Sequence, residues 1–306
     1  LEADGYRVGI IAQPDWRTGT DFMVLGRPRL GFLVTGGNMD SMVSNYTVAG
    51  KPRRNDSFCP GGIGGKRPDR ATLVYCTRIR ENFKRTNIII GGIEASLRRM
   101  AHYDYWSNKV RRSILLDSKA DLLVYGMAER QIREIASRLA TGEKAREMTD
   151  IRGTVYRSAT LPQGQTAGEP IVLPEFDHVR DARESYAKSF LIQYHENDAV
   201  RGKTLVEPYG EPPAGQYIVQ NPPPPPLETA ALDRVYALPF QRTFHPSYEI
   251  AGGVPAISEV QYSITSSRGC FGGCSFCALA FHQGRRVQGR SHESIEQEAK
   301  TLIGME

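Results

Sequence analysis

The feature that most constrains this chain is a group of three cysteines within eight residues, Cys270, Cys274 and Cys277, spaced C-x3-C-x2-C. Iron–sulfur clusters are held by cysteine thiolates that converge on one small cube. Glycines lack a Cβ and let a backbone curl tightly around such a cube. Three of them lie in this stretch, at Gly269, Gly272 and Gly273. The spacing predicts a loop that ligates three irons of a 4Fe-4S cluster and leaves the fourth iron open to a cofactor or substrate.

Structural zinc is the main alternative for the same residues. Cys270, Cys274, Cys277 and His282 would form a Cys3His set, which is a legitimate tetrahedral zinc site. The aromatic residue before the third cysteine, Phe276, the predicted strand before the loop and the helix after it favour the cluster. None of these features is required by zinc. We therefore interpret His282 as a residue near the cluster or on the substrate side.

The other two cysteines stand apart, and an odd total of five argues against a disulfide framework. Cys76 ends the apolar run Leu73-Val74-Tyr75 and is interpreted as a buried strand residue. Cys59 opens a glycine-rich segment over residues 59–67. That segment lacks the Lys-Ser/Thr pair of a phosphate-binding P-loop, so we predict a flexible loop.

Residues 1–145 alternate short β-rich runs with amphipathic segments, which predicts a Rossmann-like, doubly wound α/β domain with a mostly parallel sheet. The expected strands are Tyr6–Ile11, Leu30–Thr35, Thr72–Tyr75, Asn87–Ile90 and Leu122–Tyr125. The expected helices are Arg78–Phe83, Glu94–Met100 and Ala128–Leu139. Glycines follow several of the strands, where they are expected to make tight turns into the next helix.

Residues 146–252 are predicted to form a connector. It holds one amphipathic helix over Glu175–Glu196 and a run of five prolines, Pro222–Pro226, that should form an extended strap. Residues 253–306 then give a strand over Glu259–Ser263, the cysteine loop and a helix over His292–Ile303 capped by Ser291 or His292. This last segment is one βα unit.

The formal charge of +5 comes from basic residues scattered in pairs such as Arg98-Arg99 and Arg285-Arg286, which are interpreted as solvated faces. Without a concentrated basic stretch, the charge gives only weak support to a nucleic-acid partner. No stretch reaches the roughly 18 apolar residues of a membrane helix, and the first residues lack the pattern of a secretory signal. We expect a cytoplasmic protein with no membrane partner.

Five further motifs extend the pattern over nearly the whole chain. They are Gly91-Gly92-Ile93-Glu94-Ala95-Ser96-Leu97-Arg98-Arg99, His102-Tyr103-Asp104-Tyr105-Trp106, Val219-Gln220-Asn221-Pro222-Pro223, His245-Pro246-Ser247-Tyr248 and His282-Gln283-Gly284-Arg285. Together with Arg268-Gly269 and the cysteine spacing, they resemble the YgiQ-type family of radical S-adenosylmethionine (SAM) proteins. That family has a cobalamin-domain-like region before its radical SAM (β/α) barrel, so residues 253–306 would begin the barrel.

The resemblance implies a radical SAM enzyme of unknown reaction. Cys270, Cys274 and Cys277 would be the cluster ligands, SAM would occupy the fourth iron, and Phe276 would lie beside its adenine. An electron donor such as a flavodoxin or ferredoxin would supply the electron that cleaves SAM. The cleavage would yield a 5′-deoxyadenosyl radical, which would act on an unknown substrate. The sequence lacks the Asp-x-His-x-x-Gly motif whose histidine ligates cobalt, so we do not expect cobalamin.

A second class of function treats the protein as a binding module. The cluster would then be a redox sensor associated with nucleic acid, and the discriminating ligand is SAM, which a sensor does not need. The chain is expected to be an internal fragment of a longer protein. Because the active sites of such barrels assemble from loops after several strands, the fragment alone is expected to be inactive.

Overall fold

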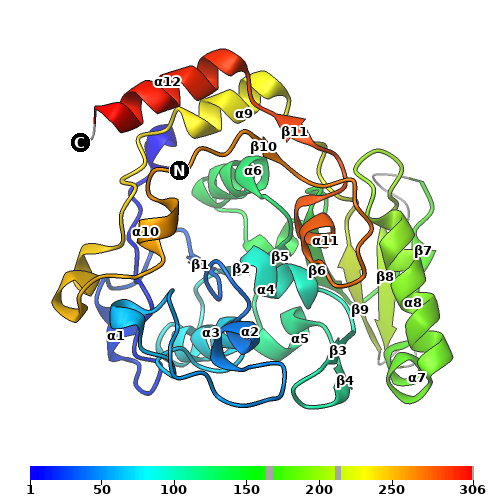
Figure 1. Cartoon of the computed structure of the whole chain (residues 1–306). Coiled ribbons are helices and arrows are strands. Elements are labelled where there is room, and N and C mark those ends of the chain that lie inside the picture. Colours follow the sequence, from blue (N-terminus) through cyan, green and yellow to red (C-terminus); the bar gives the residue numbers. More distant parts are fainter. Residues whose placement is uncertain (163–167, 211–214, 305–306) are drawn as a thin grey trace.

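The computed structural model describes residues 1–162, 168–210 and 215–304; the two internal gaps lie within the predicted connector. A central sheet of seven strands has the order β1-β2-β5-β6-β9-β8-β7 (Figure 1). Its strands are β1 Phe32–Val34, β2 Ile88–Ile90, β5 Leu122–Val124, β6 Thr154–Ser158, β7 Ile171–Val172, β8 Leu205–Tyr209 and β9 Gln216–Gln220. Two smaller antiparallel pairs are β3 His102–Asp104 with β4 Lys109–Arg111, and β10 Ser267–Arg268 with β11 Gln288–Gly289.

Twelve α-helices are present in the described ranges. They are α1 Thr20–Met23, α2 Ser41–Asn45, α3 Ala71–Asn82, α4 Gly92–Leu97, α5 Ile114–Ser118, α6 Glu129–Ala140, α7 Phe176–Asp181, α8 Arg183–Glu196, α9 Thr229–Tyr236, α10 Ile257–Val260, α11 Leu279–Gln283 and α12 His292–Ile303. Short 3-10 turns cover Glu2–Asp4, Pro60–Gly62, Ala145–Glu147 and Pro246–Ala251. Within the described ranges, none of the helices combines the length and the apolar composition of a membrane-spanning segment.

The two faces of the sheet carry separate cores. On β2, Ile88 and Ile90 pack with α3 and α5, whereas Ile89 packs with Ile135 and Leu139 of α6. Alternate residues of a strand point to opposite faces, so a fully apolar strand needs a helix on each side. The parallel strands β1, β2 and β5 with helices on both faces confirm the Rossmann-like, doubly wound α/β class.

The segment predicted as a connector adds four strands to this sheet. Strand β6 joins β5 in antiparallel register, and β9, β8 and β7 extend the sheet from there. The predicted single helix is two helices, α7 and α8, which separate at Ala182, a residue with extended backbone. Glu175 caps α7 by accepting the amides of Asp177 and His178. The domain boundaries themselves stay a prediction.

Three of the predicted strands are wrong. Thr72–Tyr75 lies in the first turns of α3, whose amino end is held by the distant carboxylate of Glu94. Tyr6–Ile11 joins no sheet, and its apolar Ile10 is 66% exposed. Glu259–Ser263 overlaps α10, where the Gln261 amide donates to Ile257 in a helical bond of 2.9 Å. A run of alternating residue types forms a strand only where a neighbouring strand supplies hydrogen-bond partners for its backbone.

The glycine-rich segment is packed, which corrects the prediction of a flexible loop. Cys59 has no exposed surface, and the Gly61 amide donates to the Gly253 carbonyl oxygen over 2.8 Å. Arg67 and Asp56 form a buried ion pair with 3.4 Å between Nη2 and Oδ2. A contact with residues far along the chain therefore orders this loop. Such a contact cannot be recognised from the sequence of the loop itself.

Helices α6 and α12 confirm the predictions made for them. Both have their apolar residues on one face, and the Ser291 hydroxyl accepts the Ser294 amide as the cap of α12. Helix α12 lies beside α9, above the central sheet in Figure 1. The cysteine loop lies between β10 and α11, so the strand that precedes it is Ser267–Arg268.

Candidate functional site: the cysteine loop

The cysteine loop begins at Gly269, where the backbone has a positive φ of 83°. A Cβ at this position would lie 2.1 Å from the carbonyl oxygen of Arg286, so only glycine fits. The Gly269 amide donates to Gln283 Oε1 over 3.1 Å, and the Cys270 amide donates to the Gly284 carbonyl oxygen over 3.3 Å. The start of the loop is therefore tied to the carboxyl end of α11.

Two of the thiols face the same glycine. The Gly272 amide donates to Cys270 Sγ over 3.3 Å, and a Cβ on Gly272 would lie 3.3 Å from Cys270 Sγ and 3.8 Å from Cys274 Sγ. An amide that donates to a cysteine sulfur is the kind of hydrogen bond that tunes iron–sulfur sites. Farther along, the Cys277 amide donates to the Cys274 carbonyl oxygen over 3.1 Å and turns the chain toward α11.

The loop is open to solvent. Cys270 is half-buried, whereas Cys274 and Cys277 are exposed. The side chains of Phe271 and Phe276 are 86% and 90% exposed. Across the described residues, no three His, Cys, Asp or Glu side chains are close enough together to hold a metal ion. The donor set and the glycines suit a cluster, but the structure does not bring the three thiolates together, so their ligand assignment remains a prediction.

Arg268, directly before the loop, is anchored by residues far along the chain. Its guanidinium forms an ion pair with Glu129 at the start of α6, and its Nε donates to the Tyr236 hydroxyl of α9 over 3.0 Å. The same guanidinium lies 5.0 Å from the centre of the Tyr236 ring. These contacts raise the pKa of Arg268 against the opposing effect of burial. The loop is therefore held at its start by two helices of the preceding segments.

The side chain of His282 contacts a helix far away in the sequence. Its Nδ1 lies 2.9 Å from Ser96 Oγ of α4, the helix that follows β2. Burial, aided by the charge of Arg99, lowers the pKa of the imidazole. The three cysteines and His282 are not close enough together in this structure to form the Cys3His set of a zinc site. Its place fits the interpretation of His282 as a residue beside the cluster loop.

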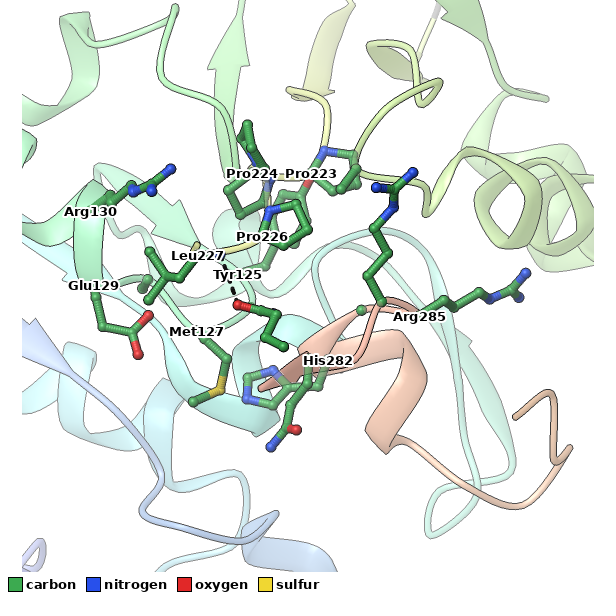
Figure 2. Close-up of a pocket in the computed structure, with 18 of the residues that line it drawn as sticks. Tyr125, Met127, Glu129, Arg130, Pro223, Pro224, Pro226, Leu227, His282 and Arg285 are labelled. Carbon is green, nitrogen blue, oxygen red and sulfur yellow. Dashed lines mark hydrogen bonds between the residues drawn. The ribbon is translucent and has the colours of Figure 1, made fainter. Parts of the chain in front are cut away.

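A cavity of about 80 Å³ adjoins this region (Figure 2). It lies between the segment after β5, the proline segment and the carboxyl end of α11. Figure 2 shows His282 next to Met127, with Glu129 and Arg130 on one side and Arg285 on the other. Open α/β sheets bind ligands outside the carboxyl ends of their strands, which is where this cavity lies.

The residues that contact α11 and hold the loop were not predicted from the sequence. The pair Arg98-Arg99 is not a solvated face: Arg98 forms an ion pair with Asp40, and Arg99 is only 1% exposed. Arginine is rarely buried, so composition favours the wrong interpretation. The resemblance of residues 91–99 to a family motif was the one signal that marked this segment.

Comparison with known proteins agrees with the resemblance seen in the sequence. A family model described as Radical SAM N-terminal matches residues 1–263. A UPF0313 protein of Clostridium perfringens is 58% identical over 302 residues, covering 99% of this chain and 45% of that protein. A UPF0313 protein of Clostridium botulinum is 54% identical over 305 residues, covering 100% of this chain and 46% of that protein. The chain thus spans less than half the length of these curated relatives.

Two solved structures of TsrM, a radical SAM methyltransferase from Kitasatospora setae, also match this chain. One, with tryptophan substrate and the SAM analogue aza-SAM bound, has a TM-score of 0.48 at 16% identity and covers 99% of this chain and 41% of that chain. The other, with cobalamin and a [4Fe-4S] cluster bound, has a TM-score of 0.47 at 18% identity and covers 99% of this chain and 42% of that chain.

The second structure corrects the expectation that cobalamin is excluded. The absent Asp-x-His-x-x-Gly motif would remove one ligand of cobalt, but it does not remove the surfaces that contact the rest of such a large cofactor. The missing motif alone is therefore no ground for excluding cobalamin. The match to residues 1–263 and the two clostridial relatives lead to one conclusion: this chain belongs to the Radical SAM N-terminal family, in the YgiQ-type group of UPF0313 proteins.

Proposed function

We propose that this chain carries the cluster site of a radical SAM enzyme, with Cys270, Cys274 and Cys277 as the ligands of a 4Fe-4S cluster. The observation that carries the proposal is the C-x3-C-x2-C loop between β10 and α11, in which Gly272 donates its amide to a cysteine sulfur. Three thiolates for four irons leave one iron open, and SAM is the cofactor that would bind there. The bound cofactors would supply one-electron cleavage of the sulfonium of SAM.

The residues of this chain would hold and orient these groups. Gly269 lets the chain turn into the loop, and Arg268 fixes the loop to α6 and α9. Phe276 is 90% exposed, so its ring is free to contact the adenine of SAM. The substrate is unknown, and a low-potential donor such as a flavodoxin or ferredoxin would supply the electron.

Anaerobic reconstitution with iron and sulfide tests the cluster. We expect a brown protein with about four irons per chain, and no cluster in Cys274→Ala. Cys76→Ala is the matched control, because Cys76 is buried in α3 and should leave the iron content unchanged. Stoichiometric zinc that iron does not replace would show that the site is not a cluster site.

SAM separates the enzyme from a redox-sensing module. We expect SAM to change the electron paramagnetic resonance (EPR) spectrum of the reduced cluster, because it would bind the open iron directly. Phe276→Ala should weaken SAM binding about tenfold while the iron content stays unchanged, whereas Phe271→Ala, the other exposed ring of the loop, should do neither. A reduced cluster whose spectrum is insensitive to SAM would favour the sensor.

A further inference from the structure

Arg99 is a buried cation without a carboxylate partner among the described residues. Its side chain is 1% exposed. The Nε donates to Gln220 Oε1 over 2.7 Å, Nη1 donates to the Ser96 carbonyl oxygen over 2.6 Å, and Nη2 has no partner in the described part of the chain. Burial lowers the pKa of this guanidinium to about 10, so it remains charged at neutral pH. An uncompensated buried charge is costly and needs another source of stabilisation.

Two aromatic rings supply that stabilisation. The guanidinium carbon of Arg99 lies 4.7 Å from the ring centre of Tyr125 and 4.1 Å from that of Phe281. Cation–π attraction is strongest when the cation is desolvated, as it is here. Tyr125 is part of the sheet core, and its hydroxyl donates to the Asn221 carbonyl oxygen. Phe281, by contrast, belongs to α11, only four residues after Cys277.

The residues on either side of Phe281 are held by the same part of the molecule. The carbonyl oxygen of Ala280 accepts the side-chain amide of Asn197 over 3.2 Å. His282 Nδ1 lies 2.9 Å from Ser96 Oγ, which also accepts the Gly126 amide. Three consecutive residues of α11 therefore contact helix α4, the residue Arg99 shortly after it, and the segment after α8.

Helix α11 is in turn hydrogen-bonded to the start of the cysteine loop. Gln283 Oε1 accepts the amide of Gly269, and the Gly284 carbonyl oxygen accepts the amide of Cys270. A displacement of α11 would therefore move the first cysteine directly. No residue between 261 and 289 is itself buried, so the loop has no core of its own to fix its position.

We propose that Arg99 is a positioning residue for the cysteine loop and acts through the ring of Phe281. The guanidinium contacts α11 through the ring of Phe281, and the position of α11 in turn determines the position of Cys270. This gives the amino-terminal domain a role in the chemistry of the loop. The inference rests on the proposed cluster where it concerns iron, but the docking of α11 on Arg99 does not depend on any bound group.

Trypsin cleavage tests the docking in the iron-free protein, because Arg285 and Arg286 follow α11 after a single residue, Gly284. We expect Phe281→Leu and Arg99→Met to raise the rate of cleavage after these two arginines about tenfold, since each removes the cation–π contact. Phe281→Tyr keeps a ring over the guanidinium and should restore the slow rate. Tyr125→Phe is the matched control: it keeps both rings, loses a buried hydrogen bond and should leave cleavage there unchanged.

EPR spectroscopy of the reconstituted protein tests the positioning. We expect Phe281→Leu to shift the spectrum of the reduced cluster, and Phe281→Tyr to reproduce the wild-type spectrum. Unchanged cleavage in both Phe281→Leu and Arg99→Met, or an equal rise in Tyr125→Phe, would overturn the docking. Altered cleavage with an unaltered cluster spectrum would overturn the positioning role. Wild-type protein that takes up no iron would refute the cluster while the cleavage results still decide the docking.

Discussion

Glu207 is a carboxyl group without exposed surface on strand β8, which lies next to the edge strand β7. Both of its oxygens accept the Ala101 amide, at 3.1 and 3.0 Å, and the Tyr209 hydroxyl donates to it over 2.5 Å. Burial outweighs these hydrogen bonds and raises the pKa of Glu207 from 4.5 to about 7. A carboxyl with a raised pKa prefers its neutral form in the folded protein.

We predict that Glu207→Gln removes a pH dependence of folding. The pKa of this carboxyl is higher in the folded protein than in the unfolded chain. Its contribution to the free energy of unfolding is therefore fully present below about pH 4.5 and is lost as the pH rises through 7. The loss amounts to roughly 3 kcal/mol, at about 1.4 kcal/mol per pKa unit. The measurement is the free energy of unfolding in urea from pH 4 to 8. Glu134→Gln, at an exposed position, should keep the wild-type profile, and a wild-type profile in Glu207→Gln would contradict the assignment.

Gly269 is a position where one residue decides the structure of the cysteine loop. We predict that Gly269→Ala impairs iron uptake, because its Cβ would meet the Arg286 carbonyl oxygen and its φ of 83° strains any other residue. The strain alone costs roughly 1 kcal/mol. Iron per chain after reconstitution is the readout. Gly289→Ala is the control, since nothing lies within 4 Å of a Cβ there; equal losses in the two variants would refute a special role for Gly269.

At the scale of elements, one carboxylate joins the amino ends of two helices. Glu94 of α4 accepts the Ser41 amide of α2 and the Thr72 amide of α3, each over 2.9 Å. The first amides of a helix have no partner within it, and a negative charge is favourable there. This contact explains why residues 72–75 form a helix despite their β-rich composition.

We predict that Glu94→Gln destabilises the protein by about 1–3 kcal/mol, because an amide nitrogen would replace one acceptor and face a backbone N–H. The free energy of unfolding in urea measures the effect. Glu81→Gln removes an exposed ion pair with Arg78 and should change stability by less than about 0.5 kcal/mol. If the two variants lose the same stability, Glu94 does not link the helices.

At the scale of the whole molecule, stability is divided unevenly between the sheet and the cysteine segment. Strands β2 and β5 are buried at every residue, whereas residues 261–289 contain no buried position. Regions with few buried contacts open locally, without unfolding the rest. The cysteine segment is therefore attached to a rigid body through a few contacts, of which α11 and Arg268 supply the main ones.

Hydrogen exchange should show this division. We predict that, in the iron-free protein, amides of β2, β5 and β6 exchange only through global unfolding. Amides of residues 269–287 should exchange at least a hundredfold faster through local opening. Mass spectrometry of peptic fragments measures both regions in one sample. Equal protection of the two regions would show that the loop belongs to the main cooperative unit.

The sequence alone determined what depends on nearby residues. The cysteine spacing and the family motifs led to the correct family, and periodic apolar residues predicted α6 and α12, because a helix and its cap are local. Only the tertiary structure decided that Arg99 is buried under Phe281, that Glu94 starts α3 and that Cys59 lies in a packed loop. These features arise from contacts between residues far apart in the chain, and the chemistry of one residue does not reveal which distant residue it will meet.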